Sequence, residues 1–183
     1  MVNDKRGGLA VRILGIDPGY AIVGYGVLEY EKGRFSPVEY GAITTRAHTQ
    51  FEDRLLEIYT DMNDLLDQVR PAAMAMESLF YQHNQTTAIA VAEARGVLLL
   101  CARQAGVPVF EYTPMQVKQA VSGYGKATKK QVQEMTKTIL KLAEVPKPDD
   151  TADALAIAIC HAYSSGSLQY GLSKTRRQLL GYD

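Results

Sequence analysis

Three extended runs joined by very short turns open the chain, and they constrain its fold more than any other feature. Apolar, β-branched and aromatic residues dominate 11–16, 20–30 and 35–45. Asp17-Pro18-Gly19 ends the first run, and Lys32-Gly33 separates the second from the third. Connections this short join antiparallel neighbours, whereas parallel neighbours need a crossover of about a dozen residues. The sequence therefore predicts an antiparallel meander of three strands.

After the meander, helical and extended patterns alternate. The expected elements are a helix over 51–69, a buried strand over 72–77, a helix over 85–105 and a strand over 107–112. Pro71 ends the first of these helices, and Gly106 follows the second as its C-terminal cap. Three helices are expected after the fifth strand: one opened by Thr113-Pro114, one from Thr128 to about Ala143, and one from Asp149 or Asp150 to about Ala162. This order predicts an α/β fold with one mixed sheet of three antiparallel and two parallel strands, flanked by helices.

The length and composition suit one compact core. The chain has 183 residues, of which 46% are hydrophobic. We expect a single domain over 1–163 and a flexible basic tail over 164–183. Cys101 and Cys160 lie in apolar runs without metal-ligand spacing, so we expect buried free thiols. Neither an export signal nor a membrane span is evident, which favours a cytoplasmic protein.

Acidic residues stand at the ends of three apolar elements. Asp17 ends the first predicted strand, Glu77 ends the fourth, and Asp150 and Asp153 open the last helix. Their three-residue spacing places the last two on one helix face. If the first and fourth strands are neighbours, all these acids converge. Adjacent carboxylates repel one another, and a hard divalent cation such as Mg²⁺ resolves this repulsion by binding their oxygens.

Each of these acids also has an ordinary structural interpretation. Asp17 before Pro-Gly fits a turn, Asp150 fits a helix N-cap, and Asp153 suits the first helical turn. Glu77 is harder to explain in this way, because it abruptly ends a very apolar strand. From the residues alone, a metal centre that hydrolyses phosphodiesters and a set of unrelated structural acids both remain open.

Charge is unevenly distributed although the formal net charge is zero. Acids dominate 52–77, and lysines dominate 112–148. The lysines of that second segment are Lys118, Lys126, Lys129, Lys130, Lys137, Lys141 and Lys147. A concentrated basic segment can bind a polyanion such as DNA. Charge alone nevertheless favours a solvated, lysine-rich helix surface.

Several motifs occur in a fixed order along most of the chain. They are ILGIDPG (13–19), GYGV (24–27), ESLF (77–80), EARGVLL (93–99), VKQAVSGYGKATKKQVQEM (117–135) and DDTADALAIAICH (149–161). Together these segments resemble the RuvC family of bacterial Holliday junction resolvases, which belongs to the ribonuclease H-like superfamily. The resemblance implies a ribonuclease H-like fold and a crossover junction endodeoxyribonuclease. Such an enzyme makes paired symmetric nicks in four-way DNA junctions during recombination and repair.

The resemblance also implies roles for individual residues. Asp17, Glu77, Asp150 and Asp153 match metal ligands, with Mg²⁺ as the metal, two ions per site and Mn²⁺ as a substitute; some family members have His at the position of Asp150. Lys118, Lys129 and Lys130 match lysines near the scissile phosphate, and catalytic roles are expected for Lys118 and Lys129. Lys130 and Lys126 are expected to bind DNA, as are Phe80 and Tyr81, whose rings could replace lost base stacking.

The implied partners are a second copy of the chain, four-way junction DNA and the branch-migration motor formed by RuvA and RuvB. A homodimer suits a two-fold substrate. The predicted helix over 85–105 is apolar on more than one side, so one face could pack on the sheet and another on a partner, although full burial within the monomer is the alternative.

Three other functions compete with this interpretation. A nucleotide-binding module of the actin and sugar-kinase type shares the GIDxG strand end, but it needs a second similar domain. A related nuclease of the same fold could act on RNA or linear DNA. A non-catalytic junction-binding scaffold is disfavoured because all four matched acids are present.

Overall fold

The computed structural model describes residues 10–78 and 87–179, with side chains described as far as residue 165. The elements follow the order predicted from the sequence. They are β1 (Val11–Asp17), β2 (Ile22–Glu31), β3 (Arg34–Thr44), α1 (Phe51–Val69), β4 (Ala73–Glu77), α2 (Ala88–Gln104), β5 (Val109–Tyr112), α3 (Pro114–Ser122), α4 (Lys129–Leu140) and α5 (Asp149–Leu179).

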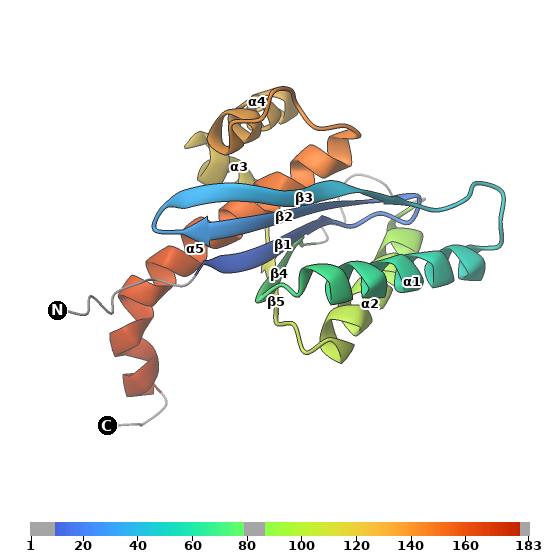
Figure 1. Cartoon of the computed structure of the whole chain (residues 1–183), viewed down its shortest axis with the longest axis horizontal. Helices are drawn as coiled ribbons and strands as arrows, with labels where there is room; N and C mark the ends of the chain where they lie inside the picture. Colours follow the sequence, from blue (N-terminus) through green and yellow to red (C-terminus); the bar gives the residue numbers. More distant parts are fainter. Residues whose placement is uncertain (1–9, 79–86, 180–183) are drawn as a thin grey trace, which may run out of the picture.

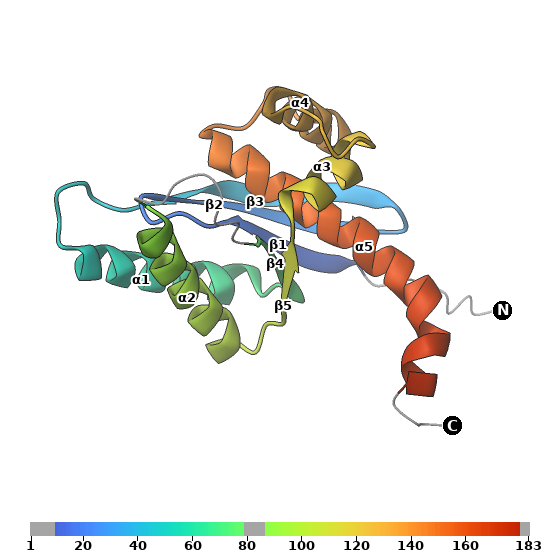
Figure 2. The same cartoon turned by 180° about the vertical axis from the view of Figure 1, so that it is seen from behind.

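The strands form one mixed sheet in the order β3-β2-β1-β4-β5. The first three pair antiparallel, whereas β4 runs parallel to both β1 and β5. Both the predicted meander and the predicted parallel pair are therefore confirmed. Figure 1 shows α1 and α2 on one face of the sheet and α5, with α3 and α4 above it, on the other. Figure 2 shows the same layers from behind.

Strand alternation directs successive sheet residues to opposite faces. Large apolar side chains, such as Leu14 and Met74, pack in one core with α1 and α2. The intervening positions Gly15 and Ala75 face α5, where a second core forms. Small residues on this face let the helix lie close to the sheet.

Glycine is required at three places beneath α5. A Cβ on Gly15 would meet the Ala154 carbonyl oxygen and would lie 2.9 Å from the Ala158 Cβ. A Cβ on Gly26 would lie 2.7 Å from the Leu155 Cγ, and one on Gly24 would lie 2.9 Å from the Asp150 Cβ. Ordinary van der Waals contacts are about 3.5–4.0 Å, so no side chain fits at these positions without moving the helix. The glycines therefore fix where α5 crosses the sheet.

The last helix differs from its prediction at both ends. It begins at Asp149, so Asp149 and Asp150 both lie in its first turn and neither caps it. It continues to Leu179, so the expected end near Ala162 is wrong. No proline occurs after Pro148, and helical backbone therefore meets no obligatory break there. The mobility of 164–183 stays a prediction.

Smaller differences occur elsewhere, and the cysteine prediction is confirmed. Helix α4 ends at Leu140, earlier than about Ala143, because Lys141 takes a left-handed conformation that closes the helix. Cys101 and Cys160 are buried free thiols.

Within 10–78 and 87–179, no helix combines the length and apolar character that crossing a bilayer requires.

Candidate active site

Asp17 and Glu77 end two neighbouring parallel strands. The register pairs Ile16 with Met76, and the two acids follow directly. Asp17 alternates with Gly15, and Glu77 alternates with Ala75, so both carboxylates project onto the face that α5 covers. Both side chains are half-buried. The predicted convergence of these strand ends is therefore present in the structure.

The start of α5 brings the other two acids to the same edge. Gly24 pairs with Asp17 in the sheet and also lies against Asp150, which places these two acids around one glycine. The buried Thr151 hydroxyl donates a 2.9 Å hydrogen bond to the Gly41 carbonyl oxygen on β3. That bond anchors the first turn of the helix to the sheet. Asp153, half-buried, lies one turn further on.

The pKa values show that the acids act on one another. Burial, followed by the charges of Asp153, Glu77 and Asp150 in that order of strength, raises the pKa of Asp17 to about 8. Burial also raises the pKa of Glu77, with a further contribution from Asp153. The structure therefore gathers carboxylates whose ionised forms are mutually unfavourable, which is the arrangement that a bound cation relieves.

Two lysines face these acids. Lys129 is the first residue of α4, and a capping box between Thr128 and Gln131 fixes the backbone there. Its Nζ lies 2.8 Å from Asp153 Oδ2. Lys118, on α3, lowers the pKa of Glu77 by its charge and thereby opposes the effect of burial.

Two of the four acids and both lysines border one open cleft of about 250 Å³, whereas Asp17 and Asp150 are not among its lining residues. The cleft is lined by Glu77, Lys118, Lys129 and Asp153, together with Pro114, Val117, Val132, Ala156 and Ile157. It therefore combines acids that can hold metal with cations that can meet phosphate, above an apolar floor. This combination suits hydrolysis of a phosphodiester.

The four candidate ligands are all carboxylates, and hard divalent cations prefer such oxygen ligands. Among the described residues, however, no group of three or more Asp, Glu, His or Cys side chains stands in a metal-binding arrangement. Asp153 instead binds Lys129. The residues thus fit the chemistry of such an ion, but in this structure their oxygens are not arranged around a common point as metal ligands would be.

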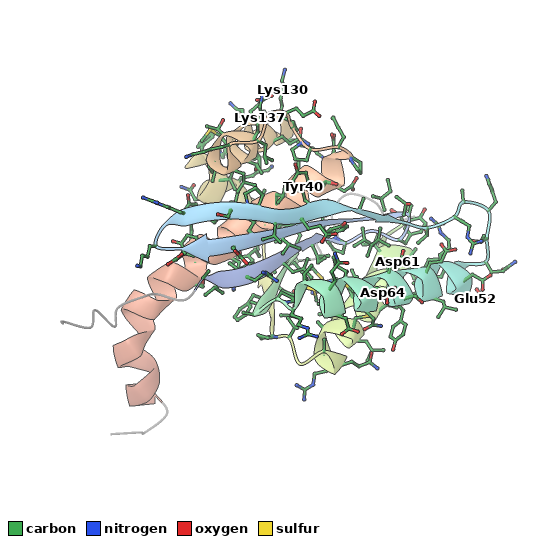
Figure 3. The ribbon with its side chains drawn as sticks, viewed as in Figure 1. Tyr40, Glu52, Asp61, Asp64, Lys130 and Lys137 are labelled. Atoms are coloured by element: carbon green, nitrogen blue, oxygen red, sulfur yellow. The ribbon has the colours of Figure 1, made fainter. Side chains whose placement is uncertain are left out.

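The other DNA-binding candidates lie outside the cleft. Lys130 lines a neighbouring hollow, and Lys126 lines another beside α3. Figure 3 shows Lys130 projecting away from the sheet on α4, whereas acids of α1 such as Asp61 lie on the far side of the sheet. Phe80 and Tyr81 lie outside the described residues.

Sequence reasoning missed the residues that position the acids. Gly15, Gly24 and Gly26 set the close approach of α5, and Thr151 anchors its first turn. A usable signal was present in the strand alternation. Gly15 shares a strand face with Asp17, and small residues on that face predict an element packed unusually close to it.

The comparisons with known proteins agree with this geometry. The family model described as crossover junction endodeoxyribonuclease RuvC matches residues 13–161. A crossover junction endodeoxyribonuclease RuvC from Brevibacillus brevis is 60% identical over 152 residues, which cover 83% of this chain and 92% of the relative.

Solved structures show the same similarity in three dimensions. The Thermus thermophilus RuvC structure has a TM-score of 0.80 and 38% identity, and the match covers 86% of this chain and 96% of that one. The structure titled T. thermophilus RuvC in complex with Holliday junction substrate has a TM-score of 0.80 and 37% identity, with 85% and 94% covered. A family match across most of the chain, on a fold that assembles the expected acids, shows that this chain belongs to the RuvC family of crossover junction endodeoxyribonucleases.

Proposed function

We propose that this chain is a Holliday junction resolvase, which makes paired symmetric nicks in four-way DNA junctions by Mg²⁺-dependent phosphodiester hydrolysis. The carrying observation is the convergence of Asp17, Glu77 and Asp150 with the Lys129–Asp153 pair in a member of the RuvC family. The T. thermophilus relative, solved with a Holliday junction substrate, supports the same substrate class for this chain. The reaction would serve recombination and DNA repair. We propose that the enzyme works in the cytoplasm.

Asp17, Glu77, Asp150 and Asp153 would hold the metal. Two Mg²⁺ ions, for which Mn²⁺ can substitute, would supply an activated water and stabilise the leaving oxygen. Ionised carboxylates are required for this, and the pKa of Asp17 near 8 means that a proton must leave that group at neutral pH. Lys118 and Lys129 border the same cleft and would bind the scissile phosphate and stabilise the charge that develops on it.

The distribution of charge supports one DNA-binding face. Lysines of α4, including Lys130 and Lys137, lie on the side of the sheet that carries the cleft, and the acids of α1 lie on the opposite side (Figure 3). Such an arrangement attracts the phosphate backbone to the cleft and repels it from the far face. Lys126 and Lys130 would extend the phosphate contacts beyond the cleft, and Phe80 and Tyr81 would replace base stacking at the crossover.

A homodimer would bring two such clefts to one junction. Helix α2 buries Ala94, Leu98, Cys101 and Ala102 against the molecule but leaves Ile89 67% and Leu100 51% exposed. Large exposed apolar side chains on an otherwise packed helix are typical of a protein–protein interface. We assign this exposed side of α2 to the dimer contact, and we propose that the dimer works with the branch-migration motor formed by RuvA and RuvB.

Leu100→Glu is expected to convert the dimer to a monomer, because the interface would then bury an unpaired charge. Sedimentation velocity would measure the change. The matched control is Leu56→Glu on α1, where the wild-type side chain is 62% exposed. A dimer that survives Leu100→Glu at micromolar concentration would remove α2 from the interface.

The proposed activity is tested by comparing substrates of one sequence. A mobile four-way junction, linear duplex DNA and an RNA duplex would each be incubated with the protein, with and without Mg²⁺. We expect symmetric nicks in the junction alone, and no cutting without a divalent metal. Equal cutting of duplex or RNA would favour the related-nuclease alternative, and junction binding without any cutting would favour a scaffold.

A further inference from the structure

Asp149 lies beside the candidate metal ligands but is not one of them. It is the first residue of α5, and its Oδ1 accepts a 2.6 Å hydrogen bond from Lys147 Nζ. Its Oδ2 lies 3.9 Å from Lys129 Nζ, the same ammonium that lies 2.8 Å from Asp153 Oδ2. Lys129 therefore stands between two carboxylates, in direct contact with one and slightly out of contact with the other.

A buried amide lies on the same side of Asp149. Gln133 follows Lys129 by one turn of α4 and is only 8% exposed. Its Nε2 makes no hydrogen bond of ordinary geometry among the described residues. The pKa of Asp149 is lowered first by the hydrogen bond from Lys147, and then by the charges of Lys147 and Lys129 and by the Gln133 amide. Asp149 thus has one oxygen bonded to Lys147 and the other oriented near the ammonium of Lys129.

A metal ion that binds Asp153 would compete with the ammonium of Lys129 for the same carboxylate. The carboxylate has lone pairs for both cations, but a divalent ion and an ammonium held by the same Asp153 oxygen would repel each other strongly at such close range, and this repulsion favours movement of the ammonium. The displaced ammonium, on a side chain that is 55% exposed, would lose its nearest counter-ion. Asp149 Oδ2 removes that cost, since a movement of roughly 1 Å brings the Nζ into ordinary charge-assisted contact with it.

We propose that Asp149 is a positioning residue that takes over Lys129 when a divalent metal ion binds at Asp153. Lys129 competes with the metal for Asp153, and Asp149 weakens that competition by offering a second carboxylate. After the exchange the ammonium remains at the mouth of the cleft, where it can meet a phosphate. The hydrogen bond from Lys147 holds the Asp149 carboxylate in place. The proposal rests on the proposed metal-dependent function.

Metal affinity and cleavage should therefore change in opposite directions when Lys129 is removed. Lys129→Met is expected to bind Mg²⁺ about fivefold more tightly, because the competing cation is gone, and yet to cleave junctions more slowly. Lys130→Met is the matched control for metal affinity alone, because it removes one charge from the next residue without touching Asp153; its cleavage is not compared, since Lys130 is a proposed DNA contact. It should leave Mg²⁺ affinity within about twofold of wild type.

Asp149→Asn tests the second half of the proposal. It should weaken Mg²⁺ binding about threefold in the wild-type background, because Lys129 is then confined to Asp153, and by much less in the Lys129→Met background. Asp149→Glu should restore most of the affinity. Isothermal titration of the metal-free dimer with Mg²⁺ measures all five variants alongside wild type without any DNA.

Two results would overturn the inference. If Asp149→Asn weakens metal binding equally with and without Lys129, Asp149 acts by its charge alone. If Lys129→Met leaves Mg²⁺ affinity unchanged, the lysine does not compete for Asp153. Failure of the proposed function is a separate outcome, since junction cleavage by the wild-type protein is measured independently of these titrations.

Discussion

Asp17→Asn is expected to abolish junction cleavage while junction binding is retained. Asp17 is the acid on which the other three converge electrostatically, and its carboxylate is required to hold the metal. Loss of a ligand that supports several kcal/mol of transition-state stabilisation lowers the rate by about a thousandfold or more. Binding survives because the substitution removes a negative charge, which does not weaken attraction to phosphate.

The same substitution should stabilise the metal-free protein at alkaline pH. The pKa of Asp17 is about 8 in the folded protein against 3.8 as the ordinary value, so the folded state holds a proton that the unfolded state has lost. Stability contributed by this group therefore falls as pH rises between these values, and the full penalty is present above about pH 8. Asparagine carries no such penalty, so the melting temperature of the variant should exceed that of wild type at pH 9 without metal.

Three measurements check these expectations together. They are single-turnover cleavage with saturating Mg²⁺, junction affinity in Ca²⁺ or without metal, and the melting temperature at pH 6 and pH 9. The matched control is Asp61→Asn, which makes the same chemical change on α1 at the far side of the sheet (Figure 3). Glu77→Gln should behave like Asp17→Asn in cleavage. Retention of wild-type cleavage by Asp17→Asn would remove this residue from the catalytic centre.

The sheet could be predicted because its signals are local. Short turns after Asp17 and Lys32 leave the first three strands only an antiparallel arrangement, and the register confirms it. The pairing of β1 with β4 was assumed and not predicted, since no local pattern indicates which strands pair. Their parallel pairing supplies the step that brings Asp17 and Glu77 together.

The contacts between elements could not be predicted in the same way. The contact between Lys129 and Asp153 depends on how α4 packs across α5, and Asp149 could be interpreted only as a helix cap. The resemblance placed Lys129 near phosphate but gave no partner for it. The end of α5 was missed for another reason: small polar residues after Ala162 were expected to end the helix, and helical backbone tolerates them.

The glycines beneath α5 show what strand alternation alone can predict. Gly24 and Gly26 could be placed on one strand face, because they are two residues apart. The identity of the element above that face depends on the tertiary fold. In the structure it is α5: Gly26 lies against Leu155, and Gly24 lies against Asp150 in the first turn, which makes Gly24 part of the site although it has no side chain.

Gly24→Ala is expected to reduce cleavage by about a hundredfold and to destabilise the fold by about 1–3 kcal/mol. The added Cβ would meet the backbone of Asp150, which cannot move aside as a flexible side chain could. The first turn of α5 must therefore lift from the sheet and carry Asp150 and Asp153 away from Asp17. Because ligand spacing is what changes, the Mg²⁺ concentration for half-maximal cleavage should rise, and excess Mg²⁺ should restore part of the rate.

Gly96→Ala is the control for this prediction. Gly96 lies on α2, where an added Cβ would meet nothing within 4 Å inside one protomer, so the change should be neutral or should stabilise the protomer by up to about 1 kcal/mol. Because this side of α2 is assigned to the dimer contact, sedimentation velocity must show that the variant remains a dimer before its Mg²⁺ titration is compared. Urea unfolding and a Mg²⁺ titration of cleavage compare the two variants directly. A folded Gly24→Ala protein with the wild-type rate and metal requirement would mean that the acids of α5 do not depend on their close approach to the sheet. Loss of stability with an unchanged metal requirement would make Gly24 a packing residue alone, since a displaced Asp150 must be apparent in metal binding.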